Sequence, residues 1–239
     1  MKNRIPPFAS LILFENEDYI IINKPPFISS LQDRVDELNI LKLAKKYHEQ
    51  AQLCHRLDKQ TSGILIISKN EEAYKFVNQQ FEKRTIEKEY HAISHGLHDF
   101  RNLEIDKPLS IHSNGTARID MRQGKRSVTL LNSMRAFRKH TLINCIPKTG
   151  RMHQIRVHLA YLKAPIVGDI AYGGEPFYLS SIKRNYKISK FAEEQPLIHR
   201  MALHAYRIGF KLLSGDFKEV IAPYPKDFRV LLNQLEKNM

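Results

Sequence analysis

A short charged segment in the first third of the chain combines residue types that suit catalysis. A cation and a carboxylate stand two residues apart in His55-Arg56-Leu57-Asp58-Lys59-Gln60-Thr61-Ser62-Gly63, which ends in a turn-forming Thr-Ser-Gly. The apolar run at 64–67 comes next and predicts a buried strand. A charged pair held in a tight loop against a buried strand is arranged for chemistry. The alternative is a surface turn in which Asp58 only caps the loop.

An arginine in the second half of the chain is the candidate partner of this carboxylate. Thr149-Gly150 predicts the start of a helix with an apolar stripe. The stripe consists of Met152, Ile155, Leu159 and Leu162. Arg156 lies at the border of the stripe, and an arginine that faces inward there needs a buried anion. Asp58 would supply it with bidentate geometry, and the alternative is a surface arginine paired with another acid.

Four segments together resemble the signatures of the RluA-type pseudouridine synthases, enzymes that isomerise uridine to pseudouridine within RNA. The segments are 55–63, Lys88-Glu89-Tyr90-His91-Ala92, 149–159 (Thr-Gly-Arg-Met-His-Gln-Ile-Arg-Val-His-Leu) and Ala202-Leu203-His204-Ala205. The resemblance runs from about Tyr19 to the end of the chain. It implies the pseudouridine synthase fold. With about fifty residues ahead of Cys54, we expect no separate S4 RNA-binding domain, so RNA recognition would fall to the catalytic domain.

The resemblance also implies roles for individual residues. Asp58 would act at the target ribose, either by attacking the sugar or by removing a sugar proton to give a glycal, and Arg156 would pair with it. Tyr90 would stack on the uracil, a safer role than proton transfer because an unperturbed phenol has a pKa of about 10. Leu203 would form an apolar wall opposite Tyr90. Thr61 is a further candidate contact to the RNA.

A uridine in folded RNA must leave its stack before it can react. By resemblance, the guanidinium of Arg56 would stack where the base was and contact phosphates, whereas the alternative is a salt bridge that shapes the loop. The isomerisation is redox-neutral, so no cofactor is expected. The chain departs from most relatives after Lys24-Pro25, where it has Pro-Phe-Ile-Ser-Ser in place of Ala-Gly and a Val-His-Pro element. Lys59 stands where an arginine is common. Because of the first departure, the resemblance does not identify which residues near the amino end would contact RNA.

The charge balance indicates a polyanionic partner. The chain has 38 basic and 25 acidic residues and a net charge of +13, which favours nucleic acid. Part of the excess lies between 118 and 139, where seven basic residues face only Asp120. Arg122, Lys125 and Arg126 are the candidate RNA-binding residues of this stretch. The alternative is a solvated basic surface.

Other classes of protein find little support in the sequence. No segment has the length of a transmembrane helix and the first residues lack a signal-peptide core, so we expect a cytoplasmic protein. Cys54 and Cys145 are too few for a disulfide framework, and Cys54 is expected to be a small buried hydrophobe. No metal site is expected, because His153 and His158 are five residues apart and no His-Glu-x-x-His pattern occurs.

Predicted strands outnumber predicted helices and do not alternate with them strictly. Strands are predicted at 18–23, 64–67, 86–94, 128–137, 141–146, 203–213 and 217–222, and helices at 38–47, at 70–83, from 149 and from about 226. This order predicts an α+β fold, with a mixed, largely antiparallel central β-sheet and flanking helices. We expect a monomer with one catalytic domain over 1–239. Residues 1–17 would be a short lead-in, and 176–198 would be a polar excursion.

Two classes of function remain. The first is a pseudouridine synthase that acts on structured ribosomal or transfer RNA, and the second is a non-catalytic RNA-binding or ribosome-assembly protein that kept the fold. The set of Asp58, Tyr90 and Arg156 favours the enzyme, because binding alone does not require it. A methyltransferase or deaminase is disfavoured, since the chain has no glycine-rich cofactor loop and no His/Cys zinc pattern.

Overall fold

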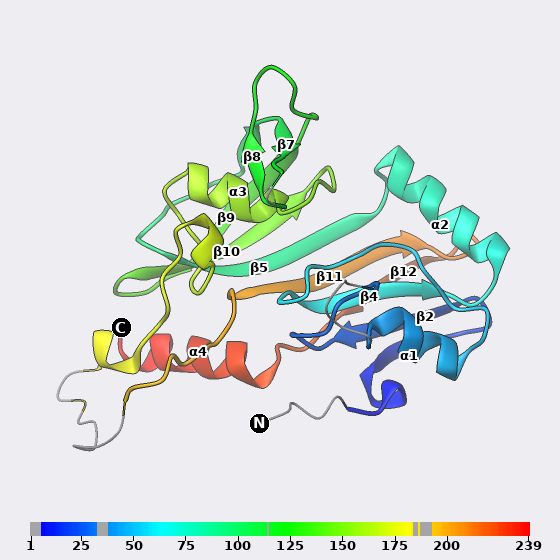
Figure 1. Ribbon diagram of the computed structural model, residues 1–239, viewed down its shortest axis with the longest axis horizontal. Coiled ribbons are helices and arrows are strands. Elements are labelled where there is room, and N and C mark those ends of the chain that lie inside the picture. Colours follow the sequence, from blue (N-terminus) through cyan, green and yellow to red (C-terminus); the bar gives the residue numbers. More distant parts are fainter. Residues whose placement is uncertain (1–5, 33–37, 114, 184–185, 187–192) are drawn as a thin grey trace. The chain divides into compact units, whose positions relative to one another are not determined.

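The computed structural model describes residues 6–32, 38–113, 115–183, 186 and 193–239 (Figure 1). The chain forms two compact units, which we call unit 1 (1–88 and 204–223) and unit 2 (89–203 and 224–239). Each unit has its own apolar core. The single domain expected over 1–239 stays a prediction.

Unit 1 is built on a mixed sheet. Its strands follow the order β1-β2-β4-β11, with β3 paired to β4 and β12 paired to β11. Only the pairing of β4 with β11 is parallel among these described strands. The elements are β1 (Ile12–Glu15), β2 (Tyr19–Lys24), α1 (Ile40–Tyr47), β3 (Gln52–Leu53), β4 (Ser62–Ser68), α2 (Glu71–Lys83), β11 (Leu203–Lys211) and β12 (Phe217–Ile221). A short 3-10 turn, Phe8–Leu11, and β1 lie in the stretch expected to be only a lead-in.

The apolar runs of unit 1 are buried on both faces of the sheet. One face packs against α2 in a cluster that contains Tyr19, Ile21, Ile64, Ile66, Ala73 and Val77. The alternate residues point to the opposite face and are equally buried: Ile20, Ile22, Leu65 and Ile67. A strand covered on both sides needs a continuous apolar sequence, which is why 64–67 predicts it so clearly.

The start of α2 follows from its own sequence. The side chain of Asn70 accepts a hydrogen bond from the backbone N–H of Ala73 at 2.8 Å. Glu71 and Glu72 occupy the first turn, where negative charge is favourable. The predicted helix over 70–83 is confirmed, with Asn70 as its N-cap.

Unit 2 contains an antiparallel set of strands in the order β5-β10-β9-β6 and a separate two-stranded hairpin, β7–β8. The elements are β5 (Glu87–His95), β6 (Leu103–Asp106), β7 (Leu109–Ile111), β8 (Ala117–Ile119), β9 (Val128–Ala136), β10 (His140–Pro147), α3 (Gln154–Tyr161) and α4 (Lys226–Lys237), with 3-10 turns at Ile170–Tyr172 and Leu179–Ser181. The sequence predicts only turns where β6, β7 and β8 lie. These strands are three or four residues long, too short to show a periodic pattern.

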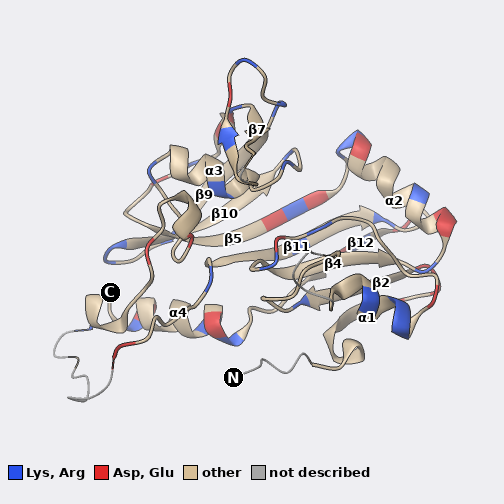
Figure 2. Ribbon diagram, in the orientation of Figure 1, with Lys and Arg blue, Asp and Glu red and all other residues tan. Residues whose placement is uncertain are grey.

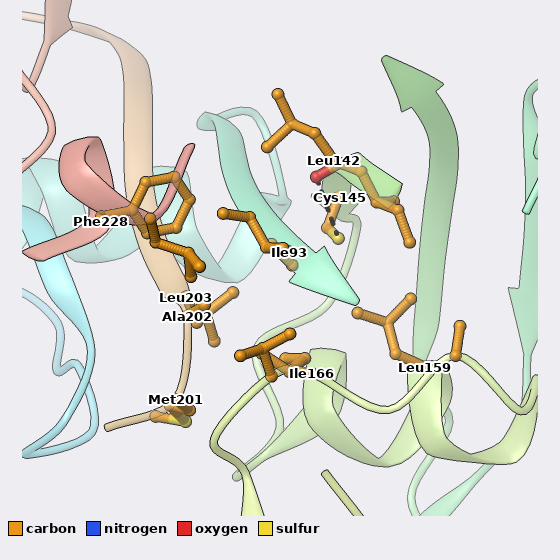
Figure 3. Close-up of a cluster of buried hydrophobic side chains, with 14 of the residues drawn as sticks. Ile93, Leu142, Cys145, Leu159, Ile166, Met201, Ala202, Leu203 and Phe228 are labelled. Carbon is orange, nitrogen blue, oxygen red and sulfur yellow. Dashed lines mark hydrogen bonds between the residues drawn. The ribbon is translucent and has the colours of Figure 1, made fainter. Parts of the chain in front are cut away.

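The core of unit 2 joins its strands to α3 and α4. Figure 3 shows the cluster, in which Ile93, Cys145, Leu159, Leu203 and Phe228 meet. Burial raises the pKa of the Cys145 thiol. Burial also raises the pKa of Cys54 in unit 1, to about 12, which fits the predicted role of a small hydrophobe. The predicted α+β class, with a mixed and largely antiparallel sheet, is confirmed.

Gly63 ends the charged segment where two backbones pass too closely for a side chain. Its φ is 115°, and a Cβ there would lie 2.2 Å from the carbonyl oxygen of Ala205. Ala205 is its partner in the parallel pairing of β4 with β11. The neighbouring pair, Ser62 and His204, is joined by a hydrogen bond of 2.9 Å between Oγ and Nδ1. Packing therefore requires glycine at the end of the segment.

Gly63→Ala should lower the free energy of unfolding by more than about 3 kcal/mol, because a backbone overlap adds to the strain of a positive φ. Gly215→Ala is the matched control. Gly215 has a φ of 90°, and nothing lies within 4 Å of its added Cβ, so this variant has the strain alone. Urea unfolding of both variants measures the difference. Equal losses would contradict the close approach at Gly63.

Candidate active site

The loop that carries Asp58 is fastened to β4 at its first residues. The backbone N–H of Cys54 donates to the carbonyl oxygen of Ile66 at 3.1 Å, and the N–H of Ile66 donates to Nε2 of His55 at 3.0 Å. Nε2 can accept only when it carries no proton. Desolvation, helped by the charge of Lys88, lowers the pKa of His55 to about 3, so the ring is neutral at physiological pH.

A second segment, 24–30, clamps the same loop. The Ser30 hydroxyl donates to the carbonyl oxygen of Leu57 at 2.9 Å and accepts the N–H of Leu57 at 3.0 Å. The carbonyl oxygen of Lys59 accepts the N–H of Phe27 at 2.8 Å and the ammonium of buried Lys24 at 3.3 Å. These bonds use main-chain groups of the loop, so they do not compete for the carboxylate oxygens of Asp58.

Phe27 accounts for one departure from the family pattern. It stands where the resemblance leads us to expect the glycine of Ala-Gly, and its φ is 67°. Left-handed backbone suits glycine and costs other residues roughly 1–2 kcal/mol. Phe27 therefore holds a backbone conformation that favours glycine. Ser30, which belongs to the same departure, supplies the clamp on Leu57.

The turn around Asp58 is closed by its own backbone. The carbonyl oxygen of Asp58 accepts the N–H of Thr61 at 3.0 Å, and the side chain of Asp58 is half-buried. Thr61 is buried, with 2% of its surface exposed, so it supports the turn from inside. Arg56 is exposed to solvent.

In unit 2, α3 begins at Gln154, later than the predicted start at 149–150. His153 has a φ of 55°, and this left-handed residue separates the preceding turn from the helix. The side chain of Gln154 accepts from the Thr149 hydroxyl at 2.6 Å and donates to the carbonyl oxygen of Val128 at 2.9 Å. Thr149 in turn accepts the N–H of Val128 at 2.9 Å. The first turn of α3 is therefore tied to β9.

The helix presents Arg156 to a buried carboxylate, that of Asp169. Nε donates to Oδ2 at 2.7 Å and Nη2 donates to Oδ1 at 2.6 Å. The two side chains are 11% and 2% exposed. The guanidinium also lies over the ring of Tyr172, 4.7 Å from its centroid. The predicted inward arginine thus has a buried anion, and this anion is an acid that the sequence pattern does not indicate. A guanidinium has five N–H donors, so its pairing with Asp58 stays a prediction.

Asp169 is placed by a loop that depends on two glycines. A Cβ at Gly168 would lie 2.3 Å from the carbonyl oxygen of Arg200, and one at Gly174 would lie 1.8 Å from that of Ile166. The N–H of Gly174 donates to the carbonyl oxygen of Asp169 at 2.9 Å. Glycines on both sides of a single acid were the available signal in the sequence, but loops share this composition.

Tyr90 and Leu203 belong to the core of unit 2. Tyr90 lies on β5 opposite Cys145 of β10, is half-buried and packs against the cluster that contains Leu203. The carbonyl oxygen of Leu203 accepts from Nη1 of Arg200 at 3.2 Å. The buried side chain of Arg200 is held by Asp227 on α4, with Nε and Oδ2 at 2.7 Å. Tyr90, Arg156 and Leu203 thus lie in unit 2, and Arg56, Asp58 and Thr61 lie in unit 1.

The predicted RNA-binding cations lie in the turn after β8. Arg122, Lys125 and Arg126 are exposed, and the backbones of Lys125 and Leu109 exchange hydrogen bonds of 2.8 and 3.0 Å. Arg126 pairs with Asp106 at 3.0 Å, so part of its charge is neutralised locally. Figure 2 shows that Lys and Arg also occur on α1 and α2. Basic residues are therefore not confined to this turn.

Neither a metal cluster nor a membrane span is found in the described part of the chain. Across those ranges, no group of three or more His, Cys, Asp or Glu side chains is arranged to hold a metal ion. His153 and His158 have separate partners: Nδ1 of His153 lies 2.7 Å from the Tyr172 hydroxyl, and Nδ1 of His158 lies 2.9 Å from the Thr129 hydroxyl. No described helix is both long and apolar enough to cross a bilayer.

Asp169→Ala should destabilise the protein by about 3–5 kcal/mol, because it leaves a largely buried guanidinium without this carboxylate. Asp99→Ala is the control in the same unit, since Asp99 pairs with Arg101 at 2.7 Å while both side chains are mostly exposed. The free energy of unfolding of Asp99→Ala should hardly differ from that of the wild type. Denaturant unfolding followed by circular dichroism compares the two, and a small effect at Asp169 would show that the buried pair is dispensable.

The chain is similar to known proteins over most of its length. The family model described as RNA pseudouridylate synthase matches residues 18–161. Ribosomal large subunit pseudouridine synthase C of Buchnera aphidicola is 36% identical over 210 residues, which are 85% of this chain and 63% of that protein. Ribosomal large subunit pseudouridine synthase D of Haemophilus influenzae is 31% identical over 234 residues, 94% of this chain and 70% of that protein.

A solved structure agrees with the sequence matches. Human RNA pseudouridylate synthase domain containing 1 is 26% identical, with a TM-score of 0.68 over 90% of this chain and 83% of that chain. The chain thus spans less than two thirds of the Buchnera relative and most of the human structure. These matches confirm the predicted resemblance, and the chain belongs to the RNA pseudouridylate synthase family.

Proposed function

We propose that this protein isomerises uridine to pseudouridine in structured ribosomal or transfer RNA, and that it does so as a cytoplasmic monomer. The observation that carries the proposal is the fastened loop of unit 1, which holds the half-buried Asp58 in one place. Family membership supports it, as do the relatives from Buchnera and Haemophilus, which are named as ribosomal large subunit enzymes.

In the proposed reaction, Asp58 acts at the ribose of the target nucleotide. The N-glycosidic bond to N1 breaks, the uracil turns over, and a carbon–carbon bond forms between C1′ and C5. The proton on C5 leaves and N1 gains a proton, so the overall reaction needs no oxidant. A carboxylate can open such a path by attack at C1′ or by removal of a sugar proton.

The other candidate residues would hold the substrate. Arg156, oriented by Asp169, would keep the Asp58 carboxylate ionised and aimed. Tyr90 would stack on the detached uracil, with Leu203 as the apolar wall. The exposed Arg56 would occupy the space left by the flipped base. Thr61 would act through the turn that it closes, since its side chain is buried.

Asp58→Asn tests the catalytic proposal with little change of shape. Pseudouridine formation should fall by at least about 10³-fold, because the side chain loses its charge and nucleophilicity. RNA affinity should change by less than about 3-fold. The assay follows tritium release from uridine labelled at C5, in RNA from cells that lack the gene. Asp216→Asn changes an exposed carboxylate of the same unit and should leave both quantities unchanged.

One outcome would favour the non-catalytic alternative: a wild-type protein that binds this RNA and forms no pseudouridine in it. Full activity in Asp58→Asn would instead contradict the proposed role of Asp58. Mapping of pseudouridines in cells with and without the gene then identifies the modified uridine. The absence of any lost site would point to a binding or assembly role.

Neutralising Arg122, Lys125 and Arg126 should weaken RNA binding and reduce the slope of log K against log salt by about 2, since each phosphate contact contributes roughly 0.7–0.9 and Arg126 is partly neutralised by Asp106. The matched control removes three exposed lysines of α1: Lys42, Lys45 and Lys46. A titration of affinity against salt compares the two triple variants. An equal change in both would indicate non-specific attraction, and unchanged binding in the first would place the RNA elsewhere.

A further inference from the structure

Tyr172 contacts three parts of unit 2: the strand β8, the residue before α3, and Arg156. Its hydroxyl accepts the backbone N–H of Ala117 on β8 at 2.8 Å. The same hydroxyl lies 2.7 Å from Nδ1 of His153, the residue that precedes α3. Its ring lies beneath the guanidinium of Arg156, 4.7 Å away. One side chain therefore connects the hairpin, the start of α3 and the candidate catalytic arginine.

The β7–β8 hairpin also packs against α3 through apolar side chains. It forms its own two-stranded sheet, and Figure 1 shows it standing beside α3. A small cluster joins the two elements, with Leu109, Ala117 and Val157 at its centre and Ile119, Met152 and Tyr172 packed against it. The basic turn that holds Arg122 follows β8 directly. RNA bound to that turn would therefore restrain β8, the strand whose Ala117 N–H binds Tyr172.

The Tyr172 hydroxyl can form both hydrogen bonds at once. A phenol donates one hydrogen bond and accepts through its lone pairs. The Ala117 N–H occupies one lone pair, and the hydroxyl shares a second hydrogen bond with Nδ1 of His153, whose direction is set by the tautomer of the ring. His153 in turn binds the helix through its carbonyl oxygen, which accepts the N–H of Val157 at 3.0 Å. Movement of β8 would thus reach the first turn of α3 as well as the ring under Arg156.

We propose that Tyr172 is a positioning residue that couples RNA docking on the basic turn after β8 to the orientation of Arg156. The proposal rests on the proposed function, in which the basic turn binds RNA and Arg156 serves Asp58. Asp169 fixes two nitrogens of the guanidinium, and Tyr172 fixes its plane from below. RNA bound at the turn would hold β8 in place, and Tyr172 would pass that restraint to the arginine.

Tyr172→Phe tests the coupling because it removes the hydroxyl and keeps the ring. Single-turnover rate and RNA affinity are measured for this substitution in the wild-type protein and in the variant with Arg122, Lys125 and Arg126 neutralised. In the wild-type background the rate at saturating RNA should fall about 5-fold or more, the value of one hydrogen bond, while affinity changes less than about 3-fold. In the neutralised background the same substitution should change the rate less than about 2-fold. Tyr178→Phe, at a tyrosine that is 37% exposed, is the control and should change neither quantity.

A second readout needs no catalysis. In ¹⁵N-labelled protein, RNA should slow exchange of the Ala117 amide and shift the Nε–H signal of Arg156, and Tyr172→Phe should abolish the shift. Equal rate losses in both backgrounds, or an Arg156 signal that ignores RNA in the wild type, would overturn the coupling. If the wild type forms no pseudouridine but the RNA-dependent shift is present and lost in Tyr172→Phe, the proposed function fails and the coupling stands.

Discussion

The buried pair of Arg156 and Asp169 is the constraint on which unit 2 depends. Removing an ionised guanidinium from water costs several kcal/mol, and only a close carboxylate with good geometry offsets that cost. The pair requires α3 to start where it does and requires the loop after Val167 to bring its carboxylate to the helix. Gly168 and Gly174 let that loop pass against neighbouring backbone, so its glycines are a condition of the ion pair.

Unit 1 holds its charged segment by other means. The loop around Asp58 is fastened through the backbone of Leu57 and Lys59 and through the neutral ring of His55. These bonds leave the carboxylate oxygens out of the fastening. A fixed backbone limits the positions that a short side chain can reach, and such preorganisation is what a catalytic carboxylate requires. Unit 1 therefore fixes the proposed catalytic carboxylate through hydrogen bonds among its own residues.

Elements with strong local signals could be predicted from the sequence, and features set by distant partners could not. Asn70 followed by two glutamates is a complete helix start, and the run at 64–67 is apolar because both of its faces are buried. By contrast, the strands of the β7–β8 hairpin have three residues each and are ordered by their pairing with each other. Asp169 has only the unspecific local signal of its flanking glycines, because its partner stands thirteen residues earlier, on a helix that begins after the left-handed His153.

Many residues in the segments that carry the family resemblance are required by packing. Gly63 is needed because Ala205 passes against it, and Gln154 is needed because its amide ties α3 to β9. A protein of this fold that only bound RNA would need both in order to fold, so their presence does not separate an enzyme from a binding protein. Asp58 is informative because its carboxylate takes no part in the bonds from Ser30, Phe27 and Ile66 that fasten the loop. An enzyme and a binding protein of this fold would therefore share the residues that packing requires.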